Sequence, residues 1–115
     1  MSGSIKETAI EGSSYKVTAT FYDESGNAVA PDTMTWTLTD EDGSVVNARE
    51  DVAFTDDPLT SSMSILLQGD DLVVDGNDQV KRIVTFEGTY TSADFGAGLP
   101  LIDESVFTLI PITII

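Results

Sequence analysis

The sequence contains no cysteine and no histidine among its 115 residues. Without cysteine, the chain has no disulfides, no zinc–thiolate sites and no thiol nucleophile. Without histidine, it lacks the usual proton shuttle near neutral pH and the commonest metal ligand. A Ser-His or Cys-His catalytic pair cannot be built from this chain. We therefore predict a non-enzymatic protein. Its fold must be held together by the packing of side chains, without disulfides.

Basic residues are scarce. Twenty acidic residues face five basic ones, and the formal net charge is −15. A chain of this charge would repel nucleic-acid phosphates and anionic membrane surfaces, so neither is expected as a partner. Lys81 and Arg82 lie together in this acidic chain, and two hypotheses are open for them: a local ion pair, or pairing with an acidic patch on a neighbouring subunit.

Long hydrophobic runs are also absent. No segment approaches the roughly 20 apolar residues of a membrane span. The N-terminal MSGSIKETAI lacks the basic and apolar regions of a signal peptide, and the C-terminal VFTLIPITII is short and interrupted by Pro111. We expect one domain over residues 1–115, made and kept soluble.

Strict alternation is the strongest pattern that the sequence does contain. In TMTWTLT, the side chains of Met34, Trp36 and Leu38 fall on one face and the threonines on the other. This is the period of a half-buried β-strand. The pair Asp42-Gly43 then supplies a tight turn.

The same pattern recurs along the chain, with turn residues about every ten positions. We expect strands in residues 5–10, 15–22, 33–39, 52–54, 61–68, 81–90 and 105–114. No window has helical periodicity. The pattern predicts an all-β protein, an antiparallel immunoglobulin-like β-sandwich of seven or eight strands with Trp36 in its core.

Three segments do not fit a simple strand. Residues 91–104 are expected to form a long loop, anchored to the core by Phe95, Leu99 and Leu101. Residues 1–10 and 110–115 are expected to be arm-like. Pro111 cannot donate to a ladder, so it should end or split the last strand. The apolar tail beyond it either packs on the sandwich or meets another chain.

Carboxylate clusters are the only candidate metal sites. None matches the EF-hand spacing, so we expect solvated turns and no cofactor, with calcium as the alternative. Two carboxylates could also run glycoside hydrolysis, but a small sandwich with one tryptophan offers little room for the cleft. The clusters are Asp40, Glu41 and Asp42; Asp56 and Asp57; Asp70 and Asp71; and Asp75 and Asp78.

Several stretches resemble small immunoglobulin-like virion proteins of tailed bacteriophages. The stretches are residues 15–47 (YKVTATFYDESGNAVAPDTMTWTLTDEDGSVVN), residues 66–74 (LLQGDDLVV), and KRIVTFEGTY followed by LPLIDESVFTL within residues 81–109. The most recognisable part is a strand followed by D-x-x-G-N and a W-T-L-T-D-x-x-G block. The resemblance covers most of the chain, but it carries no residue-level binding site with it.

The resemblance implies a virion protein made in the host cytoplasm, with a capsid decoration or cement protein as the leading hypothesis. Its partners would be the major capsid protein or another virion protein, and further copies of itself. A head–tail neck or tail component is one alternative. A host-surface or carbohydrate-binding module using Tyr22, Tyr90, Phe95 or the long loop at residues 91–104 is another. The expected partner-contacting residues are the apolar ones near the two termini: Ile5, Ile10, Leu109, Ile110, Ile112, Ile114 and Ile115.

Overall fold

The computed structural model describes residues 8–55, 58–74, 76 and 78–111. Seven strands follow one another along these residues, and the only helical segment is a three-residue 3₁₀ turn, η1. That segment is far too short to cross a membrane. The elements are β1 (Thr8–Ile10), β2 (Ser14–Thr20), β3 (Thr33–Asp40), β4 (Val52–Ala53), β5 (Ser62–Gln68), η1 (Gly69–Asp71), β6 (Val80–Ser92) and β7 (Gly96–Ile110).

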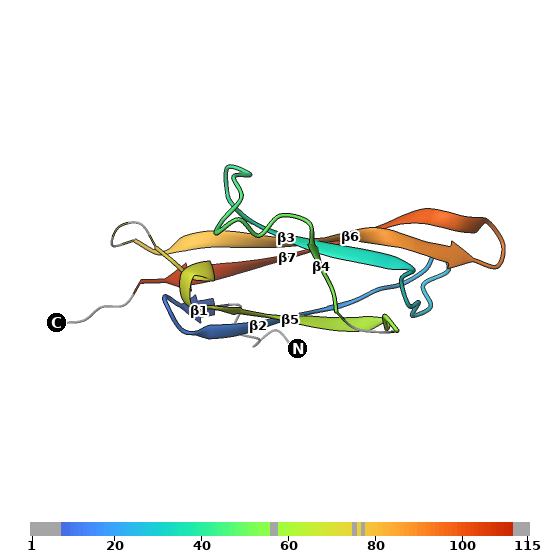
Figure 1. Cartoon of the computed structure of the whole chain (residues 1–115), viewed down its shortest axis with the longest axis horizontal. Helices are drawn as coiled ribbons and strands as arrows, with labels where there is room; N and C mark the ends of the chain where they lie inside the picture. The colour runs from blue at the N-terminus through green and yellow to red at the C-terminus, as the bar shows by residue number, and fades with distance from the viewer. Residues whose placement is uncertain (1–7, 56–57, 75, 77, 112–115) are drawn as a thin grey trace.

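The strands form two sheets that face each other (Figure 1). One sheet has five strands in the order β1-β7-β6-β3-β4, and the other pairs β2 with β5. The all-β prediction and the strand count are confirmed for the described residues. The prediction of a purely antiparallel architecture is wrong, because β1 runs parallel to β7 and makes the larger sheet mixed. The three residues of β1 are too few for their sequence to indicate whether the strand pairs in a parallel or an antiparallel direction. After β1, the chain turns at Gly12 and enters β2 in the other sheet.

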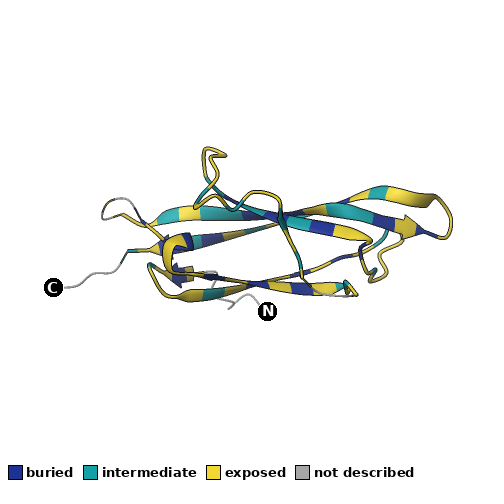
Figure 2. Ribbon diagram, viewed as in Figure 1, coloured by how far each residue is buried: buried dark blue, intermediate teal, exposed yellow. Residues whose placement is uncertain are grey.

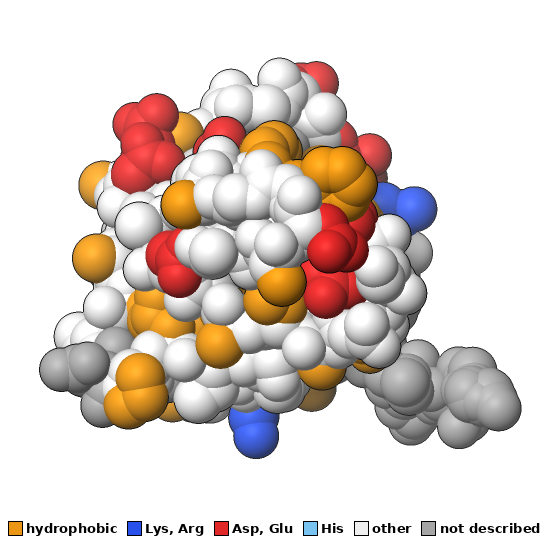
Figure 3. Space-filling model, turned by 90° about the vertical axis from the view of Figure 1, so that its right-hand side faces the viewer, with side chains coloured by type: hydrophobic (Ala, Val, Ile, Leu, Met, Phe, Trp, Pro, Cys, Tyr) orange, Lys and Arg blue, Asp and Glu red, His pale blue; other side chains and the backbone are white. Residues whose placement is uncertain are grey.

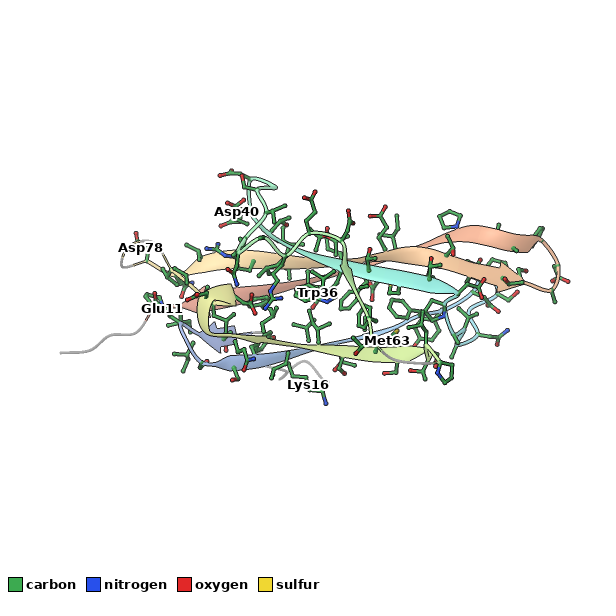
Figure 4. All side chains as sticks on the ribbon, viewed as in Figure 1. Glu11, Lys16, Trp36, Asp40, Met63 and Asp78 are labelled. Carbon is green, nitrogen blue, oxygen red and sulfur yellow. The ribbon has the colours of Figure 1, made fainter. Side chains whose placement is uncertain are left out.

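Alternating side chains make the core between the sheets. On β3 the predicted face is buried, with Leu38 fully enclosed and Trp36 nearly so, while the threonines lie outside. Met63, Ile65 and Leu67 of β5 close the core from the opposite side. Figure 2 shows buried and exposed residues alternating along the strands, and Figure 4 shows Trp36 and Met63 between the two layers while Lys16 points away from them. The core prediction from sequence periodicity is therefore confirmed on these strands.

Gly88 is a point of close backbone approach in the larger sheet. Met34 of β3 stands opposite Gly88 of β6. A Cβ atom added at Gly88 would lie 1.8 Å from the Thr33 carbonyl oxygen. Only glycine permits this approach, so the residue fixes how β3 and β6 are paired at this point.

Residues 91–104 are not the long loop that the sequence predicted. β6 continues to Ser92 and β7 begins at Gly96, so three residues join the two strands. The glycines and Pro100 indicated a loop, yet Gly96 and Gly98 adopt positive φ within an extended hairpin. β3 pairs with β6 only as far as Thr89, and Figure 1 shows the hairpin extending past the rest of the molecule.

Candidate interaction surface

An apolar stripe runs along the outer face of β1 and β7. On β7, inward residues such as Phe107 and Leu109 are buried, and the alternate positions point outward. The outward apolar side chains, which we call the β1/β7 stripe, are Ile10, Ile102, Val106 and Ile110. Ile10 and Ile102 are the most open, at 57% and 62% exposed. Scattered apolar residues are ordinary on a surface, but these four follow two neighbouring strands.

The stripe includes two of the seven residues expected to contact a partner. Ile10 and Ile110 are neighbours in the β1–β7 register, and both are exposed. Leu109 is fully enclosed in the core, so its side chain belongs to the packing between the sheets and not to a surface. The remaining four, Ile5, Ile112, Ile114 and Ile115, lie outside the described residues.

Sequence analysis missed Ile102 and Val106. Their signal was present, because LIDESVF alternates two faces with Leu101 and Phe107 on the other side. The first part of that alternation lies within the loop predicted at 91–104, which hides its period. The structure shows Leu101 and Phe107 buried and their outward neighbours exposed.

Next to η1, a buried carboxylate holds a loop against the core. The Asp71 side chain is fully buried and pairs with Arg49, whose Nε lies 2.7 Å from Oδ1. Asn47 Nδ2 donates to Oδ1 at 2.8 Å and the Gln68 backbone N–H donates to Oδ2 at 3.1 Å. Burial alone would raise the pKa of Asp71, but these hydrogen bonds outweigh it and the pKa is lowered. The Arg49 guanidinium also lies over the Trp36 ring, 5.7 Å from its centroid.

The loop that carries Arg49 has a strained backbone. Asn47, Ala48 and Asp51 all have positive φ, between 50° and 57°. That region costs most residues with a Cβ about 1–2 kcal/mol, and Ala48 bears the cost most fully because Asn and Asp adopt it more readily. The ion pair to Asp71 and a hydrogen bond from the Asp51 N–H to Thr37 Oγ1 hold the loop in place. Asp71 is bonded to Arg49 and Asn47 of this loop and to the backbone of Gln68 at the end of β5, so we assign the pair a structural role.

A second polar network fixes the end of the β6–β7 hairpin. The Tyr90 hydroxyl and Ser92 Oγ donate to the two carboxylate oxygens of Glu24, at 2.8 and 2.9 Å. Ser92 Oγ in turn accepts the backbone N–H groups of Asp94 and Phe95. The hydrogen bond from Tyr90 is the main cause of a lowered pKa at Glu24. The turn is therefore tied to the loop that follows β2.

Exposed aromatic rings lie at this same end. Phe95 is 70% exposed, so the prediction that it anchors a loop to the core is wrong. Leu101 is buried and Leu99 packs against the core, as predicted. Tyr22 is exposed, whereas Tyr90 is buried, as expected from its position on β6. Figure 3, which views this end, shows hydrophobic side chains lying next to acidic ones.

The acidic clusters do not converge. Among the residues described, no three acidic side chains gather closely enough to hold a metal ion together. Asp40 Oδ1 accepts the backbone N–H groups of Asp42 and Ser44, as in an ordinary turn. Asp71 is engaged with Arg49. Three further members of the predicted clusters lie outside the described residues: Asp56, Asp57 and Asp75.

The basic pair on β6 makes no local ion pair within the described part of the chain. Arg82 instead donates to the carbonyl oxygens of Lys81 and Val73, at 3.0 and 3.1 Å. Arg82 is thereby held against the segment that follows η1, and the Lys81 side chain stays exposed.

Comparisons with protein families, with curated proteins and with solved structures found no match to this chain.

Proposed function

We propose that this chain is a non-enzymatic structural protein of a tailed-phage virion, a decoration or cement protein that binds the assembled capsid. The observation that carries the proposal is the β1/β7 stripe: four exposed apolar side chains on two neighbouring strands of an acidic domain that has neither cysteine nor histidine. A charge of −15 favours solubility and keeps copies apart before assembly. An apolar strip provides the area that a protein partner could bury.

The proposed fold is an immunoglobulin-like sandwich. In such domains, strands G, F and C form one sheet and strands B and E lie in the other. The order β7-β6-β3 facing β2-β5 corresponds to that arrangement, with β1 beside β7. Trp36 on β3 occupies the position where such domains bury a tryptophan. This correspondence also supports the resemblance to phage virion proteins.

Binding to shells tests the proposed function. Labelled chain is added to assembled shells of the phage that encodes it, and the bound copies are counted against the major capsid protein. A decoration protein should saturate at a fixed ratio. Replacing Ile110 with lysine, on the stripe, should abolish binding. Replacing Leu66 with lysine should not, because this exposed leucine lies on the outer face of the other sheet. No saturable binding would refute the proposal.

A neck or tail component remains the alternative within the virion, and copy number separates it from a decoration protein. The exposed Phe95 and Tyr22 near acidic side chains favour one candidate of another class, a host-surface or carbohydrate-binding module. Such a module should bind cells or glycans as a free chain, and Phe95→Ala should weaken that binding. A decoration protein should show neither effect.

A further inference from the structure

Within the described residues, one edge of β7 is open along most of its length. β6 pairs with β7 throughout the hairpin, whereas β1 reaches only the last three residues, opposite Thr108, Leu109 and Ile110. Within the described residues, no strand covers the rest of this edge. Unpaired strand edges are templates for another strand.

Hydrogen bonds and register show which groups point to the open edge. The Glu11 N–H donates to the Ile110 carbonyl at 2.8 Å, so the main chain of Ile110 faces β1. The β6–β7 register is unbroken from Leu109 back to Leu99. Main-chain direction alternates along an antiparallel strand, so the N–H and C=O groups of Ile102, Glu104 and Val106 face the same side as those of Ile110.

Two neighbouring residues fit this assignment. Pro100 comes two residues before Ile102, so its main chain faces the same edge. Proline has no N–H to donate, and it is tolerated where a strand has no partner. The Glu104 N–H donates to the carboxylate of Asp103 at 2.9 Å, which is a local substitute for a ladder bond. No described strand pairs with the carbonyl of Glu104 or with the main-chain groups of Ile102 and Val106, so a further strand could bond to them.

The side chains along this edge alternate in character. Ile102 and Val106 are exposed on the outer face, and Glu104 lies between them. Successive outward positions are about 7 Å apart on a strand, so an added strand would meet an apolar, an acidic and an apolar side chain in turn. The edge therefore favours particular side chains on an added strand, in addition to offering its backbone groups for pairing.

We propose that the open edge of β7 at residues 102–106 receives an extended strand of a different protein, with a basic residue between two apolar residues on its outer face. The proposal rests on the proposed function, because it names how the chain would contact its virion partner. A second copy of this chain fits poorly. A two-fold pairing that matches Ile102 with Val106 sets Glu104 opposite Glu104, between chains that each carry −15. A basic residue at that point would be attracted instead.

Amide hydrogen exchange of the free, full-length chain tests the open edge first. The amides of Ile102 and Val106 should exchange at least about tenfold faster than those of Leu101 and Phe107, which point to β6 in the same strand. Equal protection at all concentrations would mean that other residues of the chain cover the edge. Protection that grows with concentration would mean that a second copy does. Either result overturns the proposal.

A peptide then tests the partner chemistry. The probe is Thr-Val-Thr-Lys-Thr-Val-Thr, which has the same pattern in both directions; the control peptide has Glu in place of Lys. At millimolar concentration the lysine peptide should slow exchange at Ile102 and Val106 and bind roughly two- to fivefold tighter than the control, the ratio expected for one exposed charge pair. Glu104→Lys should reverse that preference. Absence of protection, or a preference that Glu104→Lys leaves unchanged, overturns the proposal.

These measurements need no virion, so they can fail separately from the proposed function. If the chain binds shells but not the lysine peptide, the proposed function stands and the proposed edge contact is refuted. If the chain binds the peptide but not shells, the edge contact stands and the decoration role is refuted.

Discussion

Asp71 gives the sharpest test of how the loop at residues 47–51 is held. Asp71→Asn preserves the shape but removes the charge. One carbonyl oxygen then replaces the two carboxylate oxygens that accept from Arg49, Asn47 and the Gln68 N–H. Breaking a buried ion pair costs about 3–5 kcal/mol. The Arg49 side chain is 40% exposed and water can partly replace its partner, so we expect a smaller loss of about 2–3 kcal/mol.

The assay is thermal and urea unfolding followed by circular dichroism. A loss of 2–3 kcal/mol should lower the Tm by about 10 °C for a domain of this size. The matched control is Asp70→Asn, the same charge change at the exposed neighbour on η1, with an expected change within about 0.5 kcal/mol. If both variants unfold alike, the ion pair does not hold the loop.

The pH dependence follows from the direction of the pKa shift. The pKa of Asp71 is lower in the folded chain than its ordinary value. Its stabilising contribution is thus fully present above about pH 4 and is lost as pH falls through the lower, folded pKa. The stability difference between the natural chain and Asp71→Asn should therefore shrink below about pH 4. A difference that stays constant down to pH 2 would contradict the assignment.

Four further substitutions test the fold, each by the same unfolding assay. Gly88→Ala should unfold the domain or cost more than about 4 kcal/mol, because its Cβ would overlap the Thr33 carbonyl; a mild effect would show that β3 and β6 are not paired as described. Ala48→Gly should stabilise by about 0.5–1 kcal/mol by relieving a positive φ, and a loss would refute the strain. Leu109→Ala should cost about 2–5 kcal/mol whereas Ile110→Ala should cost well under 1, and equal effects would contradict the alternation at the end of β7.

The strands with one buried face could be predicted from the sequence. In TMTWTLT and SMSILLQ, every second residue is apolar, and a one-residue slip would expose the whole set. Trp36 and Met63 therefore had to face the core, and they do. Burial of alternate side chains depends only on local period, which a sequence displays directly.

The hairpin and the direction of β1 could not be predicted in the same way. Gly96, Gly98 and Pro100 break strand propensity, and only the pairing with β6 keeps that segment extended. β1 has three residues, and its parallel pairing with β7 depends on a strand 100 residues away. Both features come from tertiary contacts that override local preference.

The sequence predicted the candidate surface only in part. We expected the apolar residues near the termini at an interface. Ile110 points outward and Leu109 points into the core, and only the alternation of side chains along β7 distinguishes the two. Asp71 and Arg49 were also beyond prediction, since nothing in the sequence indicates that residues 22 positions apart would form a buried pair.

The most direct test of the proposed role is the copy number and location of this chain in purified virus particles, measured by quantitative mass spectrometry and electron cryomicroscopy. We predict a fixed ratio to the major capsid protein, with the β1/β7 stripe turned toward the shell. Particles without the chain, or with it in place but with Ile10, Ile102, Val106 and Ile110 all facing solvent, would contradict the proposal.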